Sequence, residues 1–318
     1  MPAPLVPIDG QLDYNDIHYL IFLEFYAAAN EREIMTTQTR FQIDTDLIGK
    51  YEALQNRIQQ LGSVVVAYSG GVDSSLLSVI AHQILAPHML AVTIRSQVET
   101  HGIMETAQTL AAEFGFPHQI IDYDKLQDQD YVENNPNRCY VCKSVDLGII
   151  TSIARRAGIQ YVLMGANADD LNDYRPGLRA ANELGVLSPL AEAGLTKLEI
   201  RRLARALGLG NWNFPSSPCL ASRIPYGTKV TRERLEKVAA GEAYLRALNF
   251  PIVRVRSDGA LARIEVPDQE IEKLIGLRGE ITSYFKQLGF RYITVDLQGF
   301  RSGSLNEILP EHVREPSR

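Results

Sequence analysis

The sequence of 318 residues contains three cysteines, and two of them form a C-x-x-C pair in the stretch PNRCYVCKSVD. These two are Cys139 and Cys142, and the third, Cys219, lies far downstream in SSPCLASRIPYG. A C-x-x-C pair can act as a redox dithiol, or it can supply half of a zinc site or half of an iron–sulfur site. Three cysteines fit poorly with the first two chemistries. The sequence therefore poses the question of what three thiols do together.

A second stretch that could bind a ligand is SVVVAYSGGVDSSLLS. It begins with a β-branched run typical of a buried parallel strand, which is followed by two glycines and then by an expected helix. Glycines let the backbone approach an anion closely, and the helix that follows directs N–H groups and its dipole at that anion. Serine hydroxyls can add donors, and an aspartate can hold Mg²⁺. The stretch predicts a phosphate-binding loop. Its residues are Ser69, Gly70, Gly71, Asp73, Ser74 and Ser75.

The stretch is neither a Walker A loop nor a dinucleotide-binding fingerprint, because it lacks both G-x-x-x-x-G-K and G-x-G-x-x-G. An ordinary glycine turn is the alternative, which the strand–turn–helix context disfavours. SGGVDSS resembles the PP-loop of the ATP pyrophosphatases, which release pyrophosphate and leave AMP on a carboxyl or carbonyl oxygen. The resemblance implies ATP with Mg²⁺ as cofactors, and it places the end of the next strand, at Thr93 and Arg95, beside the adenosine.

The stretch MGANADD supports a nucleotide site, because its strand delivers Gly165 and Asn167 to the carboxyl edge of the sheet. Asp169 and Asp170 follow at the start of an expected helix. Adjacent carboxylates there can cap the helix and complement its dipole, or they can serve Mg²⁺ near the phosphates. We expect one residue in each role, and we place Asp170 in the nucleotide site.

Strands and helices alternate over the first two thirds of the chain, which predicts an α/β fold with a doubly wound parallel sheet. Ligands of such sheets bind at the carboxyl ends of the strands. The pattern places strands at 63–69, 88–96, 118–124 and 161–167, and helices at 47–62, 74–85, 101–115, 143–158 and 196–210.

The pattern changes from about Thr231, where a helix precedes an antiparallel pair, PIVRVRS and LARIEV, joined by a turn at Asp258–Gly259. With one more helix and the strand RYITVDL, this predicts a smaller C-terminal α+β domain. We therefore divide the chain into an N-terminal extension at 1–43, a PP-loop domain at 44–228 and a C-terminal domain for substrate binding or oligomerisation at 229–318.

The segment SPLAEAGLTKLEIRRLARALGLGNWNFPSSPCLASRIPYG resembles the LarE family, as do NRCYVCK and MGANADD, and the similarity runs from about Asp44 to Arg301. LarE proteins are ATP-dependent sulfur transferases that make the pyridinium-3,5-bisthiocarboxylic acid mononucleotide precursor of the nickel-pincer cofactor of lactate racemase. The resemblance implies that ATP adenylates a pyridinium dicarboxylate mononucleotide and that a sulfur nucleophile then displaces AMP. It also implies a homo-oligomer, a dimer-based hexamer, and leaves the sulfide source unidentified.

The same resemblance gives Cys219 the position of the sulfur-delivering cysteine. In members with a single cysteine, that residue gives up its own sulfur and becomes dehydroalanine. In members that also carry C-x-x-C, the three cysteines hold a [4Fe–4S] cluster whose fourth iron binds an exogenous sulfide. This chain has the second pattern. Three alternatives stay open: a zinc site completed by His101 or His118, a sacrificial Cys219 acting alone, and a labile Cys139–Cys142 disulfide.

Arg254 and Arg256 lie two residues apart in PIVRVRS, so they project from one face of a strand. Arginine is suited to phosphate and carboxylate groups, and the alternative is a solvated face that pairs with Glu265. The resemblance favours substrate binding, and it adds Glu242 to Cys219 and Asp73 as a catalytic position. The further substrate-binding positions that it implies are Ser222, Arg223, Glu265 and Arg301.

The composition limits the competing functions. A net charge of −6 weighs against broad nucleic-acid binding, and this counts against a tRNA-thiolating PP-loop enzyme, the second candidate. An amide-forming PP-loop ligase would not need the cysteines, and a cluster-binding sensor would not need the phosphate loop. The N-terminus lacks a secretory signal pattern, and no apolar run reaches the roughly 18 residues that span a bilayer. We expect a cytoplasmic protein without a membrane or nucleic-acid partner.

Overall fold

The computed structural model of the chain describes residues 37–100, 102–172, 175–301 and 303–310. Most of the expected N-terminal extension, 1–43, lies outside these residues. Helix α2 (Thr37–Leu61) begins before the expected boundary at residue 44 and is followed by Gly62, whose positive φ of 70° suits glycine. The division into domains therefore stays a prediction.

A parallel sheet with strand order β3-β2-β1-β4 forms the centre of the larger unit in the described residues. Its strands are β1 (Val64–Ala67), β2 (Met89–Arg95), β3 (His118–Asp122) and β4 (Tyr161–Met164). The chain moves outward from β1 through β2 to β3 and then returns to the other side of β1 at β4. This reversal creates a switch point at the carboxyl ends of β1 and β4, where ligands of open α/β sheets bind.

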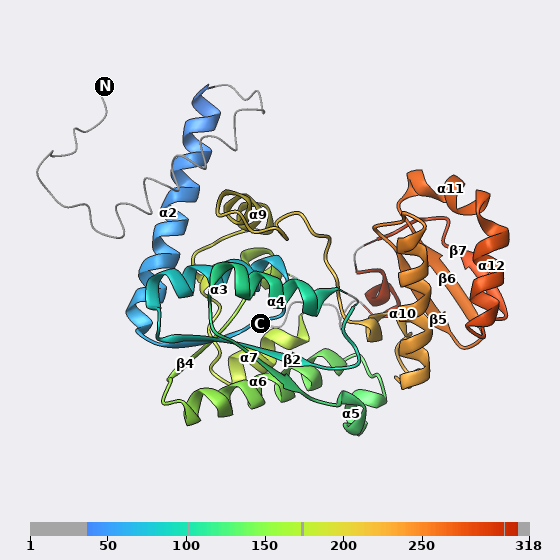
Figure 1. Cartoon of the computed structure of the whole chain (residues 1–318), viewed down its shortest axis with the longest axis horizontal. Helices are drawn as coiled ribbons and strands as arrows, with labels where there is room; N and C mark the ends of the chain where they lie inside the picture. Colours follow the sequence, from blue (N-terminus) through green and yellow to red (C-terminus); the bar gives the residue numbers. More distant parts are fainter. Residues whose placement is uncertain (1–36, 101, 173–174, 302, 311–318) are drawn as a thin grey trace, which may run out of the picture.

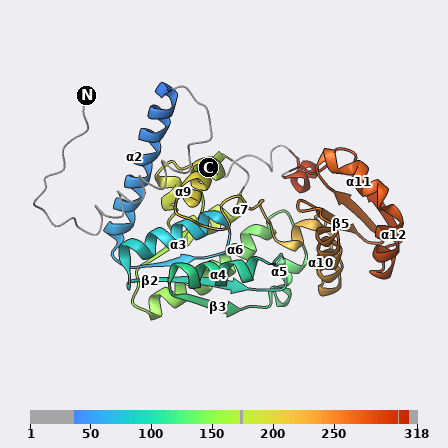
Figure 2. The ribbon, with the colours of Figure 1, turned by 45° about the horizontal axis from the view of Figure 1, so that its top comes forward.

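Helices cover both faces of this sheet (Figures 1 and 2). One face carries α3 (Val72–Leu85), α4 (Ile103–Phe114) and α9 (Lys197–Ala206), and the other carries α6 (Arg138–Arg156) and α7 (Pro176–Glu183). The run of valines in β1 serves both faces, because Val64 and Val66 belong to one apolar core and Val65 to the other. The α/β, doubly wound fold is thereby confirmed.

A smaller unit occupies the opposite end of the molecule (Figure 1). Strand β5 (Arg254–Asp258) pairs antiparallel with β6 (Leu261–Glu265), which pairs parallel with β7 (Tyr292–Val295). The tight β5–β6 connection contains Gly259 with φ +59°, in agreement with the expected turn. Helices α10 (Arg232–Ala247), α11 (Ile271–Gly276) and α12 (Arg278–Gln287) pack against this sheet through a core that includes buried phenylalanines.

Helix α6 begins at Arg138, earlier than the expected start at 143. Cys139 and Cys142 therefore lie three residues apart near its start, which places both on the same face of the helix. The stretch after β4 forms a short 3-10 turn at Ala168–Asn172 instead of the expected helix. The remaining short elements are η1 (Lys125–Gln127), α5 (Gln129–Val132), α8 (Pro189–Glu192), η3 (Leu220–Arg223), η4 (Asp268–Glu270) and η5 (Ser304–Ile308).

Within the described ranges, no helix is both long enough and apolar enough to cross a membrane.

Candidate active site

The predicted phosphate loop lies between β1 and α3. Gly70 has φ +75°, and a Cβ added to it would lie 2.8 Å from the carbonyl oxygen of Ile103, so the loop needs glycine on both grounds. Gly71 is the N-cap of α3 and supplies no side-chain hydrogen bond to the first turn. The first N–H groups of α3 are thus left uncapped by that residue, as a helix that binds an anion requires.

Hydrogen bonds among the loop residues hold this conformation. Ser74 Oγ donates to the carbonyl of Gly71 at 3.1 Å and accepts from the Ser69 N–H at 3.1 Å. Asn211, which is 1% exposed, donates from Nδ2 to the Gly70 carbonyl at 3.0 Å and to Ser75 Oγ at 3.0 Å. Ser75 therefore points inward and supports the loop. Contacts of Ser69, Ser74 and Ser75 with a nucleotide stay predictions.

A lysine that the sequence analysis did not single out reaches the loop. Lys197 Nζ forms an ion pair with Asp73 Oδ2, although the two residues are 124 positions apart. The other oxygen, Asp73 Oδ1, is buried and has no hydrogen-bond partner among the described residues. Asp73 thus keeps an unused ligand atom at the helix start. Its predicted role in Mg²⁺ binding is compatible with this geometry.

The end of β4 packs directly against the phosphate loop. A Cβ at Gly165 would lie 2.7 Å from the Ser74 backbone nitrogen, so only glycine allows this approach. Asn167 Oδ1 accepts from the N–H groups of Asp169 and Asp170 at 3.0 and 3.3 Å. Asp169 Oδ2 in turn accepts from the Lys197 N–H at the start of α9, at 2.8 Å. Asp169 therefore has the capping role, although it caps α9 and not its own segment.

Asp170 accepts from the Asn167 N–H at 3.1 Å and pairs with Arg175 at 2.8 Å. Its predicted place in the nucleotide site is untested. On the other side of β1, Thr93 Oγ1 donates to the Tyr68 carbonyl at 2.6 Å and lies 2.8 Å from His118 Nε2. Arg95 pairs with Asp122 at 2.6 Å. The predicted adenosine contacts of Thr93 and Arg95 likewise stay predictions.

The three cysteines are free thiols. Cys139 and Cys142 lie near the start of α6, and Leu220, next to Cys219, donates to the Val98 carbonyl just after β2 at 2.7 Å. Cys219 immediately precedes η3, and both Cys142 and Cys219 pack against one apolar cluster that includes Tyr131 and Leu220. Cys139 and Cys142 each lie within electrostatic range of Cys219. The fold thus brings thiols that are distant in the sequence near one another.

Two buried polar residues tie the segments that carry the thiols. Asn134 adopts φ +56° and donates from Nδ2 to the carbonyls of Pro225 and Thr228, both at 2.8 Å. Arg138, which is 1% exposed, donates to the Ala221 carbonyl at 2.9 Å and to Asn134 Oδ1. The start of α6 is therefore fastened to the Cys219 loop.

A buried cation lies beside the Cys142 thiol. Lys125 Nζ is 3.0 Å from Cys142 Sγ and 2.8 Å from Asp146 Oδ2, and the lysine is 7% exposed. Burial lowers the pKa of Lys125, but the charges of Cys142 and Asp146 outweigh that effect and raise it. Burial raises the pKa of the Cys142 thiol to about 12, and Asp146 adds to the rise. Cys142 would therefore become a thiolate at neutral pH only when a strong cation, such as a coordinated metal, compensates for burial.

Within the described ranges, no three His, Cys, Asp or Glu side chains are arranged to hold a single metal ion. His101, one of the two histidines considered for a zinc site, lies outside the described residues. The other, His118, is bonded to Thr93 at the start of β3.

The Cys219 loop is also held from the smaller unit. Arg223, fully buried, donates to both carboxylate oxygens of Glu242 on α10, at 2.7 and 3.0 Å. Its Nη1 donates to the carbonyls of Pro218 and Cys219, at 2.6 and 3.2 Å. Glu242 also accepts from Arg246 at 2.7 Å. These contacts are those of residues that shape the loop, while catalysis by Glu242 and substrate binding by Arg223 remain untested.

Replacing Glu242 by glutamine is expected to cost about 3 kcal/mol of unfolding free energy at pH 7, because it leaves the buried Arg223 without its carboxylate. Burial acts to raise the pKa of Glu242, but the pairs with Arg223 and Arg246 lower it below its ordinary value of 4.5. Its stabilising effect is therefore complete above that value and is lost as the pH falls through the lowered one. Urea unfolding should show a gap between wild type and Glu242→Gln that narrows below about pH 4.

Glu233→Gln is the matched control, because Glu233 lies on the same helix in an exposed pair with Lys237. Surface pairs of this kind contribute about 0–1 kcal/mol. Equal losses in the two variants would contradict the structural role assigned to Glu242.

The two arginines of β5, Arg254 and Arg256, have different partners. Arg256 donates to both oxygens of Glu265 at 2.9 Å and to the Ser222 carbonyl at 2.7 Å, so the alternative pairing with Glu265 is realised. Arg254 donates to the Ser216 carbonyl at 2.6 Å, and no described carboxylate forms an ion pair with it. Burial, followed by the charge of Arg223, lowers the pKa of Arg254 to about 10. Arg254 is thus a buried cation that forms no ion pair with any described residue.

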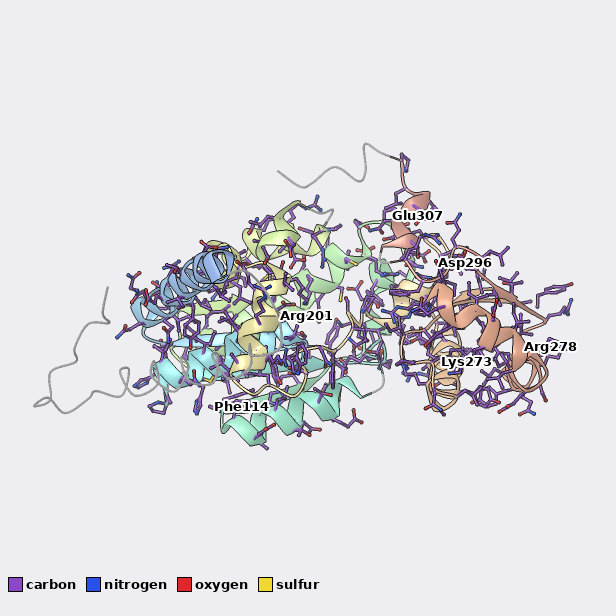
Figure 3. All side chains as sticks on the ribbon, turned by 90° about the horizontal axis from the view of Figure 1, so that it is seen from above. Phe114, Arg201, Lys273, Arg278, Asp296 and Glu307 are labelled. Carbon is purple, nitrogen blue, oxygen red and sulfur yellow. The ribbon has the colours of Figure 1, made fainter. Side chains whose placement is uncertain are left out.

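Arg301 lies farther out on the smaller unit. It pairs with Glu307 at 3.1 Å and with Asp296 at 3.7 Å, and Figure 3 labels both carboxylates on that unit. These two carboxylates neutralise Arg301 in this conformation. Its predicted contact with substrate is not tested by this arrangement.

The parallel sheet of order β3-β2-β1-β4, with the S-G-G-V-D-S loop leading into a helix at its switch point, defines a PP-loop ATP pyrophosphatase. The NAD synthase family, which has this type of loop, matches residues 49–140.

Similarity to individual proteins extends over most of the chain. It is 40% identical over 264 residues to the pyridinium-3,5-bisthiocarboxylic acid mononucleotide synthase of Lactiplantibacillus plantarum, covering 83% of this chain and 96% of that protein. It is 42% identical over 265 residues to an uncharacterized protein of Synechocystis, covering 83% and 99%. An uncharacterized protein of Methanocaldococcus jannaschii is 32% identical over 240 residues, covering 75% and 91%. The chain belongs to the LarE family, which confirms the prediction of an ATP-dependent enzyme that inserts sulfur.

Proposed function

We propose that the protein converts the carboxylates of a pyridinium-3,5-biscarboxylic acid mononucleotide into thiocarboxylates, for the synthesis of a nickel-pincer cofactor. The observation that carries this proposal is the connection between the two halves of the site. Asn211 bonds to the phosphate loop at Gly70, and the same segment continues to Cys219, whose neighbour Leu220 donates to Val98 at 2.7 Å. The segment from Asn211 to Cys219 thus connects the phosphate loop to the thiols. This arrangement suits adenylation followed by sulfur transfer.

The chemistry proceeds in two balanced steps. A substrate carboxylate oxygen attacks the α-phosphorus of ATP, and pyrophosphate leaves with the electron pair of the broken P–O bond. A sulfide sulfur then attacks the acyl carbon, and AMP leaves as the C–O bond breaks, which gives a thiocarboxylate. A carboxylate is a poor electrophile, and the acyl adenylate supplies the leaving group that it lacks. The uncapped first turn of α3 and the Lys197 ammonium would stabilise the phosphate charge that develops in the first step.

We further propose that Cys139, Cys142 and Cys219 hold a [4Fe–4S] cluster. The donor set fits in its chemistry, because it consists of three thiols, and Cys139 and Cys142 each lie within electrostatic range of Cys219. When bound, such a cluster supplies one iron position at which an exogenous sulfide can be carried. Cys139 is exposed and Cys142 and Cys219 are partly exposed, so sulfide can reach the thiols from solvent.

The substrate phosphate and carboxylates would be bound by the arginines of the smaller unit. Arg254 is the best placed, because its charge has no described anionic partner and it contacts the loop of Cys219 through Ser216. Ser222, Arg223, Arg256, Glu265 and Arg301 would complete or support that surface. Assembly into a homo-oligomer, expected from the family, is also part of the proposal, and analytical ultracentrifugation measures it directly.

The decisive experiment is anaerobic purification with iron reconstitution, followed by incubation with ATP, sulfide and the dicarboxylate mononucleotide. We expect about four irons per chain, substrate-dependent pyrophosphate release, and repeated formation of thiocarboxylate seen by mass spectrometry. Zinc without iron would refute the cluster. Conversion of Cys219 to dehydroalanine after a single turnover would establish the sacrificial route, and pyrophosphate release triggered by tRNA alone would overturn the substrate assignment.

A further inference from the structure

Phe300, in the loop that follows β7, places its ring over the guanidinium of Arg254. The guanidinium carbon lies 5.1 Å from the ring centroid. The face of an aromatic ring is negative and attracts a cation at this distance, most strongly where water is excluded. Arg254 is 7% exposed, so this contact is largely shielded from solvent. The ring is therefore a direct neighbour of the cation that would bind the substrate in the proposed function.

The carboxylates closest to Arg254 are bound to other arginines. Glu265 lies directly opposite Arg254 in the register of β5 and β6. It accepts two hydrogen bonds from Arg256, both at 2.9 Å, and pairs with Arg263 at 3.4 Å. The buried Glu242 is likewise bound to arginines other than this one. The charge of Arg254 is therefore not used by an ion pair with either carboxylate.

Neutral groups hold Arg254 instead. Its Nη1 donates to the Val253 carbonyl at 3.1 Å, its Nη2 donates to the Ser216 carbonyl at 2.6 Å, and the ring of Phe300 covers the guanidinium. Carbonyl oxygens and an aromatic face fix the direction of a planar guanidinium without cancelling its charge, as a carboxylate would. A guanidinium has five N–H groups, so it keeps donors for an oxyanion after these two bonds.

The backbone fixes the place of the Phe300 ring. The N–H of Gly299 donates to the Asp296 carbonyl at 3.0 Å, and the N–H of Phe300 donates to the Val266 carbonyl, just after β6, at 2.9 Å. Gly299 has φ +65°, and a Cβ added to it would overlap Asp268 Oδ1, so the turn needs glycine. The turn after β7 thus attaches the ring to the same sheet that carries the guanidinium.

We propose that Phe300 is a positioning residue of the substrate site, and that its ring holds the Arg254 guanidinium with its remaining N–H groups directed at an oxyanion of the substrate. The inference rests on the proposed function, in which Arg254 binds the pyridinium mononucleotide. A guanidinium that is oriented before the anion binds loses less conformational freedom on binding, and this raises the affinity. Phosphate and carboxylate both match a guanidinium fork, so the tests include each of them.

The first test needs neither cluster nor substrate. Phenylglyoxal modifies accessible arginines, and peptide mass spectrometry follows its reaction with Arg254. In Phe300→Leu we expect this reaction to be about three- to tenfold faster than in wild type, because the ring no longer covers and holds the guanidinium. Phe300→Tyr keeps the ring and should react at the wild-type rate. Phe214→Leu should do so too, because it removes a phenyl ring that is 47% exposed and two residues from Ser216.

Inorganic phosphate and pyridine-3,5-dicarboxylate then serve as protecting anions in the same reaction. Protection of Arg254 by phosphate would assign it to the phosphate of the substrate, and protection by the dicarboxylate alone would assign it to a carboxylate. In Phe300→Leu the concentration that gives half protection should rise about three- to tenfold. If neither anion protects Arg254 in wild type, the proposed anion site is wrong.

The second test measures the complete reaction. Phe300→Leu should raise the KM for the dicarboxylate mononucleotide about three- to tenfold, because it weakens binding of the substrate and of the transition state equally. The kcat and the KM for ATP should stay within twofold, and Phe300→Tyr should restore the KM for the mononucleotide. Phe300→Met, which lacks the aromatic face but fills a similar space, should behave as Phe300→Leu and replaces it if leucine prevents folding.

The outcomes separate the two proposals. A wild-type KM for the mononucleotide and a wild-type phenylglyoxal rate in Phe300→Leu would overturn the role of Phe300. A joint loss of kcat and of ATP affinity would overturn it as well, in favour of a packing role. A wild-type protein that releases no pyrophosphate with the mononucleotide would refute the proposed function. The phenylglyoxal and protection measurements would still decide whether Phe300 holds Arg254 for an anion.

Discussion

Cys219→Ala is expected to abolish thiocarboxylate formation, by a factor of about 10³ or more, while substrate-dependent pyrophosphate release falls less than tenfold. In the proposed reaction, adenylation needs the phosphate loop and the arginines of the smaller unit, and Cys219 belongs to neither. Sulfur transfer needs the thiol in both the cluster and the sacrificial route. The measurement is parallel quantification of pyrophosphate and thiocarboxylate from one reaction under anaerobic conditions. Repeated thiocarboxylate formation by this variant would eliminate Cys219 as the sulfur-delivering residue.

Cys142→Ala separates the two routes and serves as the companion variant. If the three cysteines hold a cluster, this change should remove most of the bound iron and end multiple turnover. If Cys219 is sacrificial, one equivalent of sulfur per chain should still be transferred. Iron content and the number of turnovers per chain are read from the same preparation.

Gly165→Ala is expected to weaken ATP binding at least tenfold while the protein stays folded. The added Cβ would lie 2.7 Å from the nitrogen and 3.0 Å from the Cα of Ser74, and both are backbone atoms that a side-chain rotation cannot relieve. Either β4 or the first turn of α3 must move, and overpacking of this kind costs about 1–3 kcal/mol. The displaced groups are those that we propose to bind the phosphates, so the substitution should lower nucleotide affinity. Isothermal titration with a non-hydrolysable ATP analogue measures it.

Gly148→Ala is the control for this substitution. Gly148 lies inside α6, and a Cβ added there meets no atom within 4 Å. Alanine is favoured over glycine in a helix interior by about 0.5–1 kcal/mol, so this variant should be slightly more stable and bind ATP normally. Normal ATP affinity in Gly165→Ala would show that the contact with Ser74 does not position the phosphate loop.

The elements of the fold that could be predicted are those with a local signal. The valines of β1, the two glycines of the loop and the turn at Gly259 each carry their structure in adjacent residues, and all of them were placed correctly. The start of α6 was misplaced, because the expected helix at 143–158 began only after C-x-x-C. The structure begins the helix at Arg138, whose buried guanidinium reaches the Ala221 carbonyl.

The site residues that were missed are polar side chains whose partners lie far along the chain. Asn211 bonds to Gly70 across 141 positions, Lys197 pairs with Asp73 across 124, and Asn134 reaches Thr228 across 94. Nothing near Asn211 or Asn134 in the sequence indicates these contacts, because folding alone brings the partners together. Lys125 was missed for the same reason, because its contact with Cys142 Sγ is made across 17 positions and belongs to no motif.

The loop that carries Cys219 is fastened on both sides. Asn134 and Arg138 hold it from the nucleotide-binding unit, while Arg223, Arg254 and Arg256 connect it to α10 and β5 of the smaller one. A recombination point between residues 216 and 265 would combine the Cys219 loop with α10 and β5 from a different relative. The buried arginines would then lose the carboxylates with which they pair. Chimeras between relatives should therefore tolerate exchange of this block as a whole and fail when it is cut. The loop and the smaller unit would then be inherited together, as one transferable part.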